Sequence, residues 1–264
     1  MFRYLQLAGQ FWKLSIQDDA AYRSHFFMHI LQALFQLLGE LIGLWTIFSN
    51  TQEVAGWTVW ELLALLGVFR VMGGMIGLII QPNMRQIMEQ VRDGTLDYII
   101  LKPVNTQFYM SASRIVIWRG VDVLVGLAVA TFASVKLSTQ VSVPQVINFL
   151  ILLAAGMVII YSIWLALGTL AFWFTRINNI EMVFWNVFEA GRYPVDIYRP
   201  WPAMRLGLTY VIPLAFLTTF PASALIGRHH NVNPLFGVLV AGVSLFAATS
   251  FFHCGLRRYS SASS

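Results

Sequence analysis

Residues 137–175 form a run without a single Asp, Glu, Lys or Arg. An α-helix needs about 20 mostly apolar residues to cross a bilayer, so this run is long enough to contain a membrane span. The whole chain supports this interpretation, because 58% of its 264 residues are hydrophobic and only 11% are charged, against about 25% charged residues in a soluble domain. A soluble enzyme, a nucleic-acid-binding module and a disordered regulator are therefore excluded. The sequence predicts an all-α protein that crosses the membrane several times.

Apolar segments of spanning length recur along the chain. Besides the crossing within 137–175, the expected spans are 25–48, 59–80, 119–136 and 233–256. Residues 1–23 are too polar to cross, but they carry apolar side chains at helical spacing, at Leu5, Ala8, Phe11, Trp12 and Ile16. This first segment is expected to be an amphipathic helix that lies on the cytoplasmic leaflet and contacts lipid.

Basic residues gather on one side of the predicted topology. They follow the second, fourth and last spans: Arg85, Arg92, Lys102, Arg114, Arg119, Arg176, Arg257 and Arg258. Because Lys and Arg collect in cytoplasmic loops, both termini and the segment 82–113 are expected in the cytoplasm. Termini on one side require an even number of crossings, and six fit the spacing. Topology thus explains the net charge of +5, and no nucleic-acid partner is expected.

The fifth crossing has two candidates. Residues 205–227 are the more apolar, but they contain Pro213 and Pro221, and such helix breaks are tolerated at membrane depth only inside protein or beside a cavity. Residues 177–191 are shorter and less apolar. If the shorter segment crosses, residues 192–228 form a re-entrant helical hairpin. Hydropathy alone selects 205–227, the helix-breaking prolines keep 177–191 as the rival, and both options give six crossings.

Four charged residues fall within predicted crossings: Glu40, Arg70, Glu181 and Glu189. A charge at the centre of a span costs on the order of 3 kcal/mol on insertion scales, so each requires a partner or a water-filled path. Glu40 and Arg70 can form an ion pair if the first two spans pack together through Gly39-x-x-x-Gly43 and Gly73-x-x-x-Gly77. Such a pair is either structural or part of a translocation path. The glycine motifs also fit a contact between two subunits.

Motifs for catalysis or cofactor binding are missing. The sequence contains no G-x-x-x-x-G-K-[ST] phosphate loop, no G-x-S-x-G elbow, no H-E-x-x-H and no C-x-x-C. His25 and His29 share one helical face, but no Cys or carboxylate lies nearby in the sequence, so an interfacial polar girdle is favoured over a metal site. The lone Cys254 allows no disulfide framework. No catalytic residue, metal or cofactor is expected.

The most distinctive segment lies in the predicted cytoplasmic loop 82–113 and reads VRDGTLDYIILKPVN over 91–105. A helix is expected to end at Gly94, as glycine commonly does at a helix carboxyl end. Thr95 or Asp97 can then cap a second, short helix. A compact helical projection of this kind has the shape of a docking element, and the alternative is a solvated loop.

This segment resembles the loop of bacterial type-2 ABC exporter permeases in which the pattern is R-x-G-x-L-D-x-x-L-x-[KR]-P. A second block, FEAGRYPVDIYRPWPAMRLGLTYVIPLAFLTTFPASALIG over 188–227, and the ending GLRRYSSASS resemble the same branch. The two blocks occur in the same order as in the family, and the resemblance extends over essentially the whole chain.

The resemblance implies a permease subunit with a single transmembrane domain over 1–264, six membrane helices and a place in the bacterial inner membrane. It implies two partners, a separate ABC ATPase and a second permease chain that is the same or related. The loop between the second and third helices would carry a coupling helix over 92–104. The residues implied to shape and seat it are Arg92, Gly94, Leu96, Asp97, Leu101 and Pro103.

In such a permease, ATP binding and hydrolysis in the partner would move the coupling helix and drive export of a small amphipathic or lipid-like molecule. The expected path residues are the four intramembrane charges, Glu40, Arg70, Glu181 and Glu189. The resemblance also implies that 178–191 cross and that 194–226 form an external hairpin, which would leave Arg192, Arg199 and Arg205 outside.

A self-sufficient secondary transporter or channel is the alternative function. In that case the intramembrane charges themselves would carry protons or ions. Folds of that kind often contain an inverted repeat, and the sequence contains no convincing internal repeat.

Overall fold

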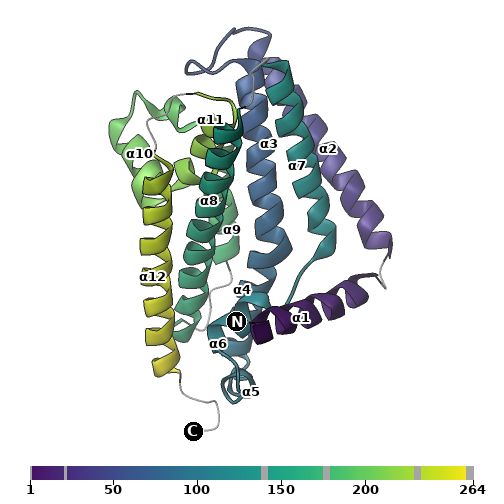
Figure 1. Cartoon of the computed structure of the whole chain (residues 1–264), viewed down its shortest axis with the longest axis vertical. Helices are drawn as coiled ribbons and strands as arrows, with labels where there is room; N and C mark the ends of the chain where they lie inside the picture. Colours follow the sequence, from purple (N-terminus) through teal and green to yellow (C-terminus); the bar gives the residue numbers. More distant parts are fainter. Residues whose placement is uncertain (1, 21–22, 138–141, 175–178, 229–232, 260–264) are drawn as a thin grey trace.

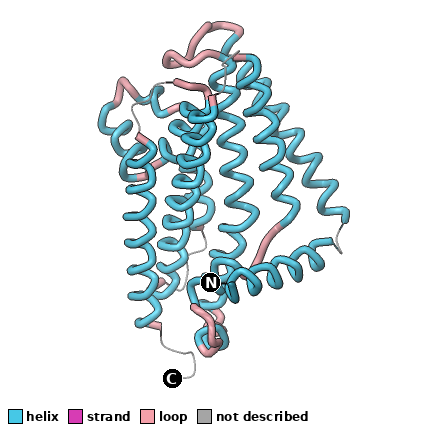
Figure 2. The backbone as a smooth tube through the Cα atoms, viewed as in Figure 1, coloured by secondary structure: helices cyan, strands magenta, loops and turns pink. Residues whose placement is uncertain are grey.

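Helices make up nearly all of the regular structure (Figure 2). The computed structural model describes residues 2–20, 23–137, 142–174, 179–228 and 233–259. Within these ranges the only extended pairing is an isolated bridge between Val54 and Trp57. Among the described residues, five helices are long and apolar enough to cross a membrane, and a bent pair of helices is the sixth candidate. The predicted all-α, polytopic membrane fold is confirmed.

The predicted spans correspond to helices with closely similar ends. They are α2 (Arg23–Phe48), α3 (Val59–Met75), α7 (Gly120–Lys136, after a 3₁₀ turn η2 over Ile117–Arg119), α8 (Val143–Thr169, extended by a 3₁₀ turn η3 over Leu170–Phe172) and α12 (Pro234–Arg258). α7 packs along α3, and α12 packs along α8 (Figure 1). In the most apolar stretch of the helix that begins with α3, 78% of the residues are buried, whereas the corresponding share in α2 is 11%. α3 is therefore the central helix, and α2 lies at the periphery.

α3 extends well beyond one membrane thickness. It continues through a π-helical turn, η1 (Ile76–Ile80), into α4 (Gln81–Arg92), so that one helical rod covers 34 residues. At about 1.5 Å per residue the rod is about 51 Å long, whereas the hydrocarbon core is about 30 Å thick. Its last turns must project from the membrane, at the end of the bundle where α1 and the last turn of α12 also lie (Figure 1).

α1 (Phe2–Ala20) lies across this end of the bundle, as the amphipathic pattern predicts (Figure 1). Edge-to-face ring contacts join it to α6 (Thr106–Ala112), with centroid distances of 4.8 Å between Tyr4 and Phe108 and 5.2 Å between Phe11 and Tyr109. The Asp19 carboxylate accepts a hydrogen bond of 3.0 Å from the backbone N–H of Ile117. α1 is therefore attached to α6 and to the start of η2, in the second half of the loop that follows α4.

The glycine motifs do not pack the first two spans together, so that prediction is wrong. A Cβ atom added at Gly39 or Gly43 would meet no atom within 4 Å. Gly74 and Gly77 instead face the chain around the start of α7, where added Cβ atoms would lie 2.8 Å from the backbone N of Val123 and 2.9 Å from Cδ of Arg119. These glycines bring α7 close to α3, because no side chain separates the two backbones.

The closest approach of α3 and α7 leads to a stability prediction. A Cβ atom at Gly67 would lie 2.5 Å from the backbone N of Ala130, so Gly67→Ala must push two helices apart. We expect Gly67→Ala to lower the free energy of unfolding by about 1–3 kcal/mol, measured as a lower melting temperature in detergent. Gly242→Ala in α12 is the matched control, since it meets open space and exchanges glycine for a better helix former. Equal melting temperatures for the two variants would contradict the packing argument.

The described residues between α8 and α12 form short elements. They are α9 (Ile180–Glu189), η4 (Ala190–Arg192), η5 (Val195–Tyr198), α10 (Pro202–Leu206), η6 (Gly207–Val211), η7 (Ala215–Thr219) and α11 (Phe220–Leu225). α9 has 10 residues and is therefore about 15 Å long, half of the hydrocarbon core. The segments Pro202–Val211 and Ala215–Leu225 meet at 69°. Hence no straight helix covers 205–227.

This arrangement bears on both candidates for the fifth crossing. α9 lies beside α8 at mid-height, and α10 and α11 lie near the end opposite α4 (Figure 1). α9 alone is too short to cross, and by length and composition the bent pair fits either a broken span or a re-entrant hairpin. Pro213 stands at the bend, between the two segments, where a missing backbone N–H is tolerated because protein surrounds it.

Polar contacts join the segment 195–228 to the beginning of α3. The indole N–H of Trp57 donates a hydrogen bond of 3.0 Å to the buried Asp196 carboxylate. Arg228 Nη1 lies 3.1 Å from both carboxylate oxygens of Glu61, and its guanidinium stacks over the Trp57 ring at 4.7 Å. Arg205 also reaches Asp196, at 3.5 Å. The end of the bundle opposite α4 is thus held by ion pairs and one buried carboxylate.

Candidate functional site

The loop after α4 forms a compact helical projection. α4 ends at Arg92, and Gly94 adopts a φ of +69°, a left-handed conformation that favours glycine. The turn leads into α5 (Asp97–Ile100), which is a single helical turn. Leu96 and Ile99 anchor α5 to the hydrophobic core, with 0% and 5% of their surface exposed.

The opposite face of α5 is open to solvent. Tyr98 is 73% exposed, and Leu101, directly after the helix, is 82% exposed. Large apolar side chains in this position form an exposed apolar patch, and such patches commonly mark a contact with another protein. The projection therefore has a buried anchor on one side and an apolar contact surface on the other.

A fully bonded asparagine closes the base of this projection. Asn83 is 0% exposed, and its side-chain N–H groups donate to the backbone oxygens of Ile79 and Arg114 at 2.6 and 2.7 Å. Its oxygen accepts hydrogen bonds from the backbone N–H of Arg114 at 2.9 Å and from the Ser113 hydroxyl at 3.1 Å. Because every polar atom of Asn83 is paired, both ends of the loop are held together as one rigid unit.

α6 connects the projection to the far helices of the bundle. The Gln107 amide donates to the Tyr161 hydroxyl on α8 at 3.2 Å and to the Thr249 hydroxyl on α12 at 3.1 Å. At the carboxyl end of α12, burial raises the pKa of the Tyr259 phenol, and the nearby Asp97 carboxylate adds to this effect. A displacement of α5 and α6 would thus be transmitted to α8 and α12.

A second site is the buried ion pair that the sequence predicted between the first two spans. Arg70 Nε on α3 donates to Glu40 Oε2 on α2 at 2.7 Å, and both side chains are 3% exposed. Arg70 Nη2 also reaches the backbone oxygen of Ala33 at 3.4 Å. Because α2 is otherwise largely exposed, these contacts fix its position against α3.

The pair belongs to a larger charged cluster that the sequence reasoning missed. Asp122 on α7 lies 3.9 Å from Arg70 Nη1, 3.5 Å from Arg119 Nη1 and 3.0 Å from His29 Nε2. On the other side, Arg192 Nη2 lies 3.7 Å from Glu40 Oε1. The sequence contained one indication, the spacing of three residues between Arg119 and Asp122, which allows an ion pair on a helix. In the structure these two side chains occupy the space left by Gly77 and Gly74.

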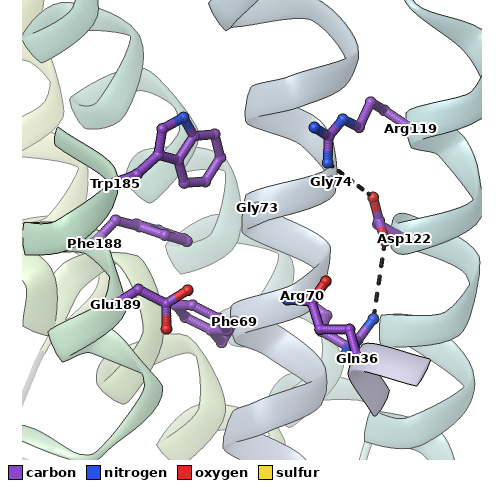
Figure 3. A pocket seen from close by; sticks show the side chains of 10 residues that line it. All are labelled: Gln36, Phe69, Arg70, Gly73, Gly74, Arg119, Asp122, Trp185, Phe188 and Glu189. Atoms are coloured by element: carbon purple, nitrogen blue, oxygen red, sulfur yellow. Dashed lines mark ion pairs between the residues drawn. The ribbon is translucent and has the colours of Figure 1, made fainter. Parts of the chain in front are cut away.

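A cavity of about 300 Å³ lies beside this cluster (Figure 3). One wall consists of the aromatic side chains Phe69, Trp185 and Phe188, and Phe69 and Phe188 stack with centroids 4.7 Å apart. Arg119 and Asp122 lie on the facing wall, and the backbone of α3 at the glycines runs between the two (Figure 3). The cavity therefore combines an aromatic side and a charged side.

Comparison with known proteins identifies the family. A family model described as ABC-2 family transporter protein matches residues 34–263, from within α2 to near the carboxyl end. This chain belongs to the ABC-2 transporter family. The search of curated proteins found no match. The family and the apolar helices together establish a multi-pass membrane protein that is an ABC permease.

In this ABC-2 permease the six residues implied to form the coupling helix occupy different positions. Gly94 forms the turn, and Leu96 is a buried anchor. Arg92 pairs with its neighbour Asp93 at 2.9 Å. The remaining three lie around α5: Asp97 begins it, and Leu101 and Pro103 follow it at the exposed tip. Tyr98, which the sequence reasoning did not select, is among the most exposed side chains there.

The four expected path residues of the permease do not lie together. Arg70 and Glu189 line the cavity, and Glu40 contacts Arg70 beside it. Glu189 also pairs with Arg192 at 2.6 Å. Glu181 lies apart from them, in the first turn of α9, where it pairs with Arg85 of α4. Its contacts attach α9 to the base of the projection.

Proposed function

We propose that this ABC-2 permease is the membrane subunit of an ATP-driven exporter and that a separate ABC ATPase docks on α5. The observation that carries the proposal is the exposed pair Tyr98 and Leu101 on a helical turn whose other face is anchored by Leu96 and Ile99. Aromatic and aliphatic side chains that enter a pocket of a partner supply most of the binding energy in protein interfaces. The residues over 92–104 are thus the coupling element.

The contacts of the projection suggest how ATP hydrolysis drives transport. The base is rigid because Asn83 joins its two ends, and α6 is bonded to α8 and α12 through Gln107. Force applied to α5 therefore displaces α8 and α12 instead of bending the loop. The result is alternation between states that open to opposite sides of the membrane.

The cargo in this proposal is a small amphipathic or lipid-like molecule. Glu40, Arg70 and Glu189 lie at or beside the mixed aromatic and charged cavity, which suits a molecule with a polar head and an apolar body. Glu181, the fourth residue expected in the path, pairs with Arg85 away from the cavity, and its proposed role is to attach α9 to the base of the projection. Since the charges of Glu40 and Arg70 are paired with each other, they are poor carriers of a proton or ion, which weighs against a self-sufficient transporter.

The proposed assembly is a dimer of permease chains, identical or related. α2 presents an apolar face to its surroundings, and an added Cβ atom at Gly39 or Gly43 would meet nothing within 4 Å. Small residues four apart allow close helix packing in lipid. With the basic residues of 82–114 in the cytoplasm, both termini are cytoplasmic, and the membrane is the bacterial inner membrane.

Purification of the tagged chain from its host in a mild detergent tests the proposal. Mass spectrometry of the co-purified proteins should identify an ATPase with a P-loop, present in amounts comparable to the permease. Membranes from a strain with an untagged chain are the control for background. A chain that is purified alone and transports in vesicles without ATP would contradict the proposal and favour an ion-coupled mechanism.

A further inference from the structure

We infer that the cavity between α3, α7 and α9 binds a zwitterionic group, with its anionic part at Arg119 and its cationic part at Glu189. This inference rests on the proposed function in one respect only, that the bound molecule is the exported cargo. Binding itself is a property of the permease chain.

The first argument is which charged side chains a ligand can reach. Arg70 is 3% exposed and is occupied by Glu40 and the Ala33 backbone oxygen, so it holds the structure together. Arg119 is 40% exposed and Glu189 is 47% exposed, although each has one ion-pair partner. Both line the cavity, and Figure 3 places them on its two sides. One accessible cation and one accessible carboxylate therefore face the same space.

The second argument is the charge balance of the lining. Arg70 and Arg119 are matched by Asp122 and Glu189, and the adjacent Glu40 and Arg192 add one charge of each sign. A ligand with a net charge would leave an uncompensated charge beside this balanced set, which is unfavourable where the charges are partly desolvated. A ligand with no net charge but two opposite charges matches both walls.

The third argument is the aromatic wall on the Glu189 side. Trp185 stands one helical turn before Glu189 on α9, and its ring contacts Phe188 edge-to-face at 5.6 Å. In Figure 3 the Glu189 carboxylate lies beside Phe69 and Phe188, with the Trp185 indole beyond Phe188. Aromatic faces next to a carboxylate are a favourable site for an ammonium group, particularly a methylated one. The guanidinium of Arg119 is suited to a phosphate or carboxylate. These two preferences set the orientation of the bound group, with its cation at Glu189 and its anion at Arg119.

The zwitterionic group can belong to an amphiphile or to a water-soluble molecule. A volume of about 300 Å³ is at the lower limit of ligand pockets, so it accommodates a head group and not a whole lipid. Helices α2 and α9 beside the cavity carry exposed apolar side chains, among them Phe35 and Met182. These surfaces would contact the chain of an amphiphile.

The test is binding of radiolabelled lysophosphatidylcholine to the purified full-length permease, with its co-purified partners, in dodecyl maltoside. We expect saturable binding that unlabelled lysophosphatidylcholine displaces, whereas the anionic lysophosphatidylglycerol and the cationic dodecyltrimethylammonium do not. Displacement by glycerophosphocholine at equal concentration would identify a soluble zwitterion as the ligand. Displacement by the lysolipid alone would identify an amphiphile.

Substitutions locate the binding to this cavity. Arg119→Gln and Glu189→Gln should each weaken binding by about tenfold or more, whereas Arg119→Lys keeps the charge and should retain most of it. Arg257→Gln, at an exposed arginine on α12, is the matched control. Each variant is first compared with the wild type by gel filtration. If Arg119→Gln aggregates, Glu189→Gln decides alone, since its side chain is nearly half exposed.

Equal displacement by all three charge types, or unchanged binding in both glutamine variants, would overturn the inference. An ATPase that still co-purifies in that case leaves the proposed exporter function intact. Conversely, binding with the expected pattern but without any ATPase would overturn the exporter proposal and retain the site.

Discussion

Leu101→Asp is expected to disrupt the coupling of this permease to the ATPase that we propose docks on α5. Leu101 is 82% exposed in the chain, so the substitution should leave the permease folded and inserted. In the docked complex it places a carboxylate in an apolar contact. The loss of a central contact residue costs about 2 kcal/mol or more, which corresponds to roughly 30-fold weaker association. The measurement is cargo-stimulated ATP hydrolysis by the purified complex in proteoliposomes.

The controls separate docking from folding. Leu101→Met keeps an apolar side chain of similar size and should retain activity close to that of the wild type. Tyr98→Ala should reduce coupling in the same direction as Leu101→Asp, because both side chains lie on the exposed face of α5. Wild-type ATP hydrolysis and transport in Leu101→Asp would show that the partner docks elsewhere.

The second large effect is expected at the buried ion pair. Arg70→Met leaves the carboxylate of Glu40 buried with Arg192 Nη2 at 3.7 Å as its remaining ion-pair partner. Removing one member of a buried pair costs about 3–5 kcal/mol. For a chain of this size, such a loss lowers the melting temperature by about 10 °C. Thermal denaturation in detergent, monitored by gel filtration after heating, measures it.

Two further variants test whether the unpaired charge is the cause. Glu40→Leu combined with Arg70→Met removes both charges and should recover most of the lost stability. Arg85→Met breaks the pair with Glu181, in which Arg85 is 56% exposed, and should cost about 1 kcal/mol or less. A double variant as unstable as Arg70→Met alone would indicate that lost packing, and not the buried charge, is responsible.

The membrane spans were predictable because length and hydropathy determine them. The charge-free run contains α8, and the ends of α7 and α12 differ from the expected 119–136 and 233–256 by only one or two residues. The region of α9 to α11 could not be decided in this way. Its two candidate segments satisfy different criteria, and the bend of 69° depends on how the surrounding helices bury a broken backbone.

The charged cluster was only partly predictable. Glu40 and Arg70 are conspicuous because they interrupt apolar spans, so their pairing followed from the cost of a lone charge. Asp122 and Arg119 stand at the start of a span, where charge is ordinary, and their role depends on the contact of α3 with α7. The glycines that create this contact were assigned to the wrong pair of helices, since small residues show that helices approach closely but not which ones.

The projection after α4 was predictable in its shape. Gly94 ends the helix as expected, although the side chain of neither Thr95 nor Asp97 caps α5, because the residue preceding the helix is the buried Leu96. The exposed position of Tyr98 was not predictable. A helix of one turn has no periodicity, so the sequence does not indicate which of its side chains face the bundle.

Photo-crosslinking from position 98 tests the central proposal, that α5 docks the ATPase, most directly. The permease carries p-benzoylphenylalanine in place of Tyr98, and a second version carries it in place of Gln52, an exposed residue at the opposite end of the bundle. The account predicts that irradiation of the assembled complex joins position 98, but not position 52, to a protein with a P-loop. A crosslink from position 52 alone, or none from position 98 in a complex that retains its ATPase, would contradict it.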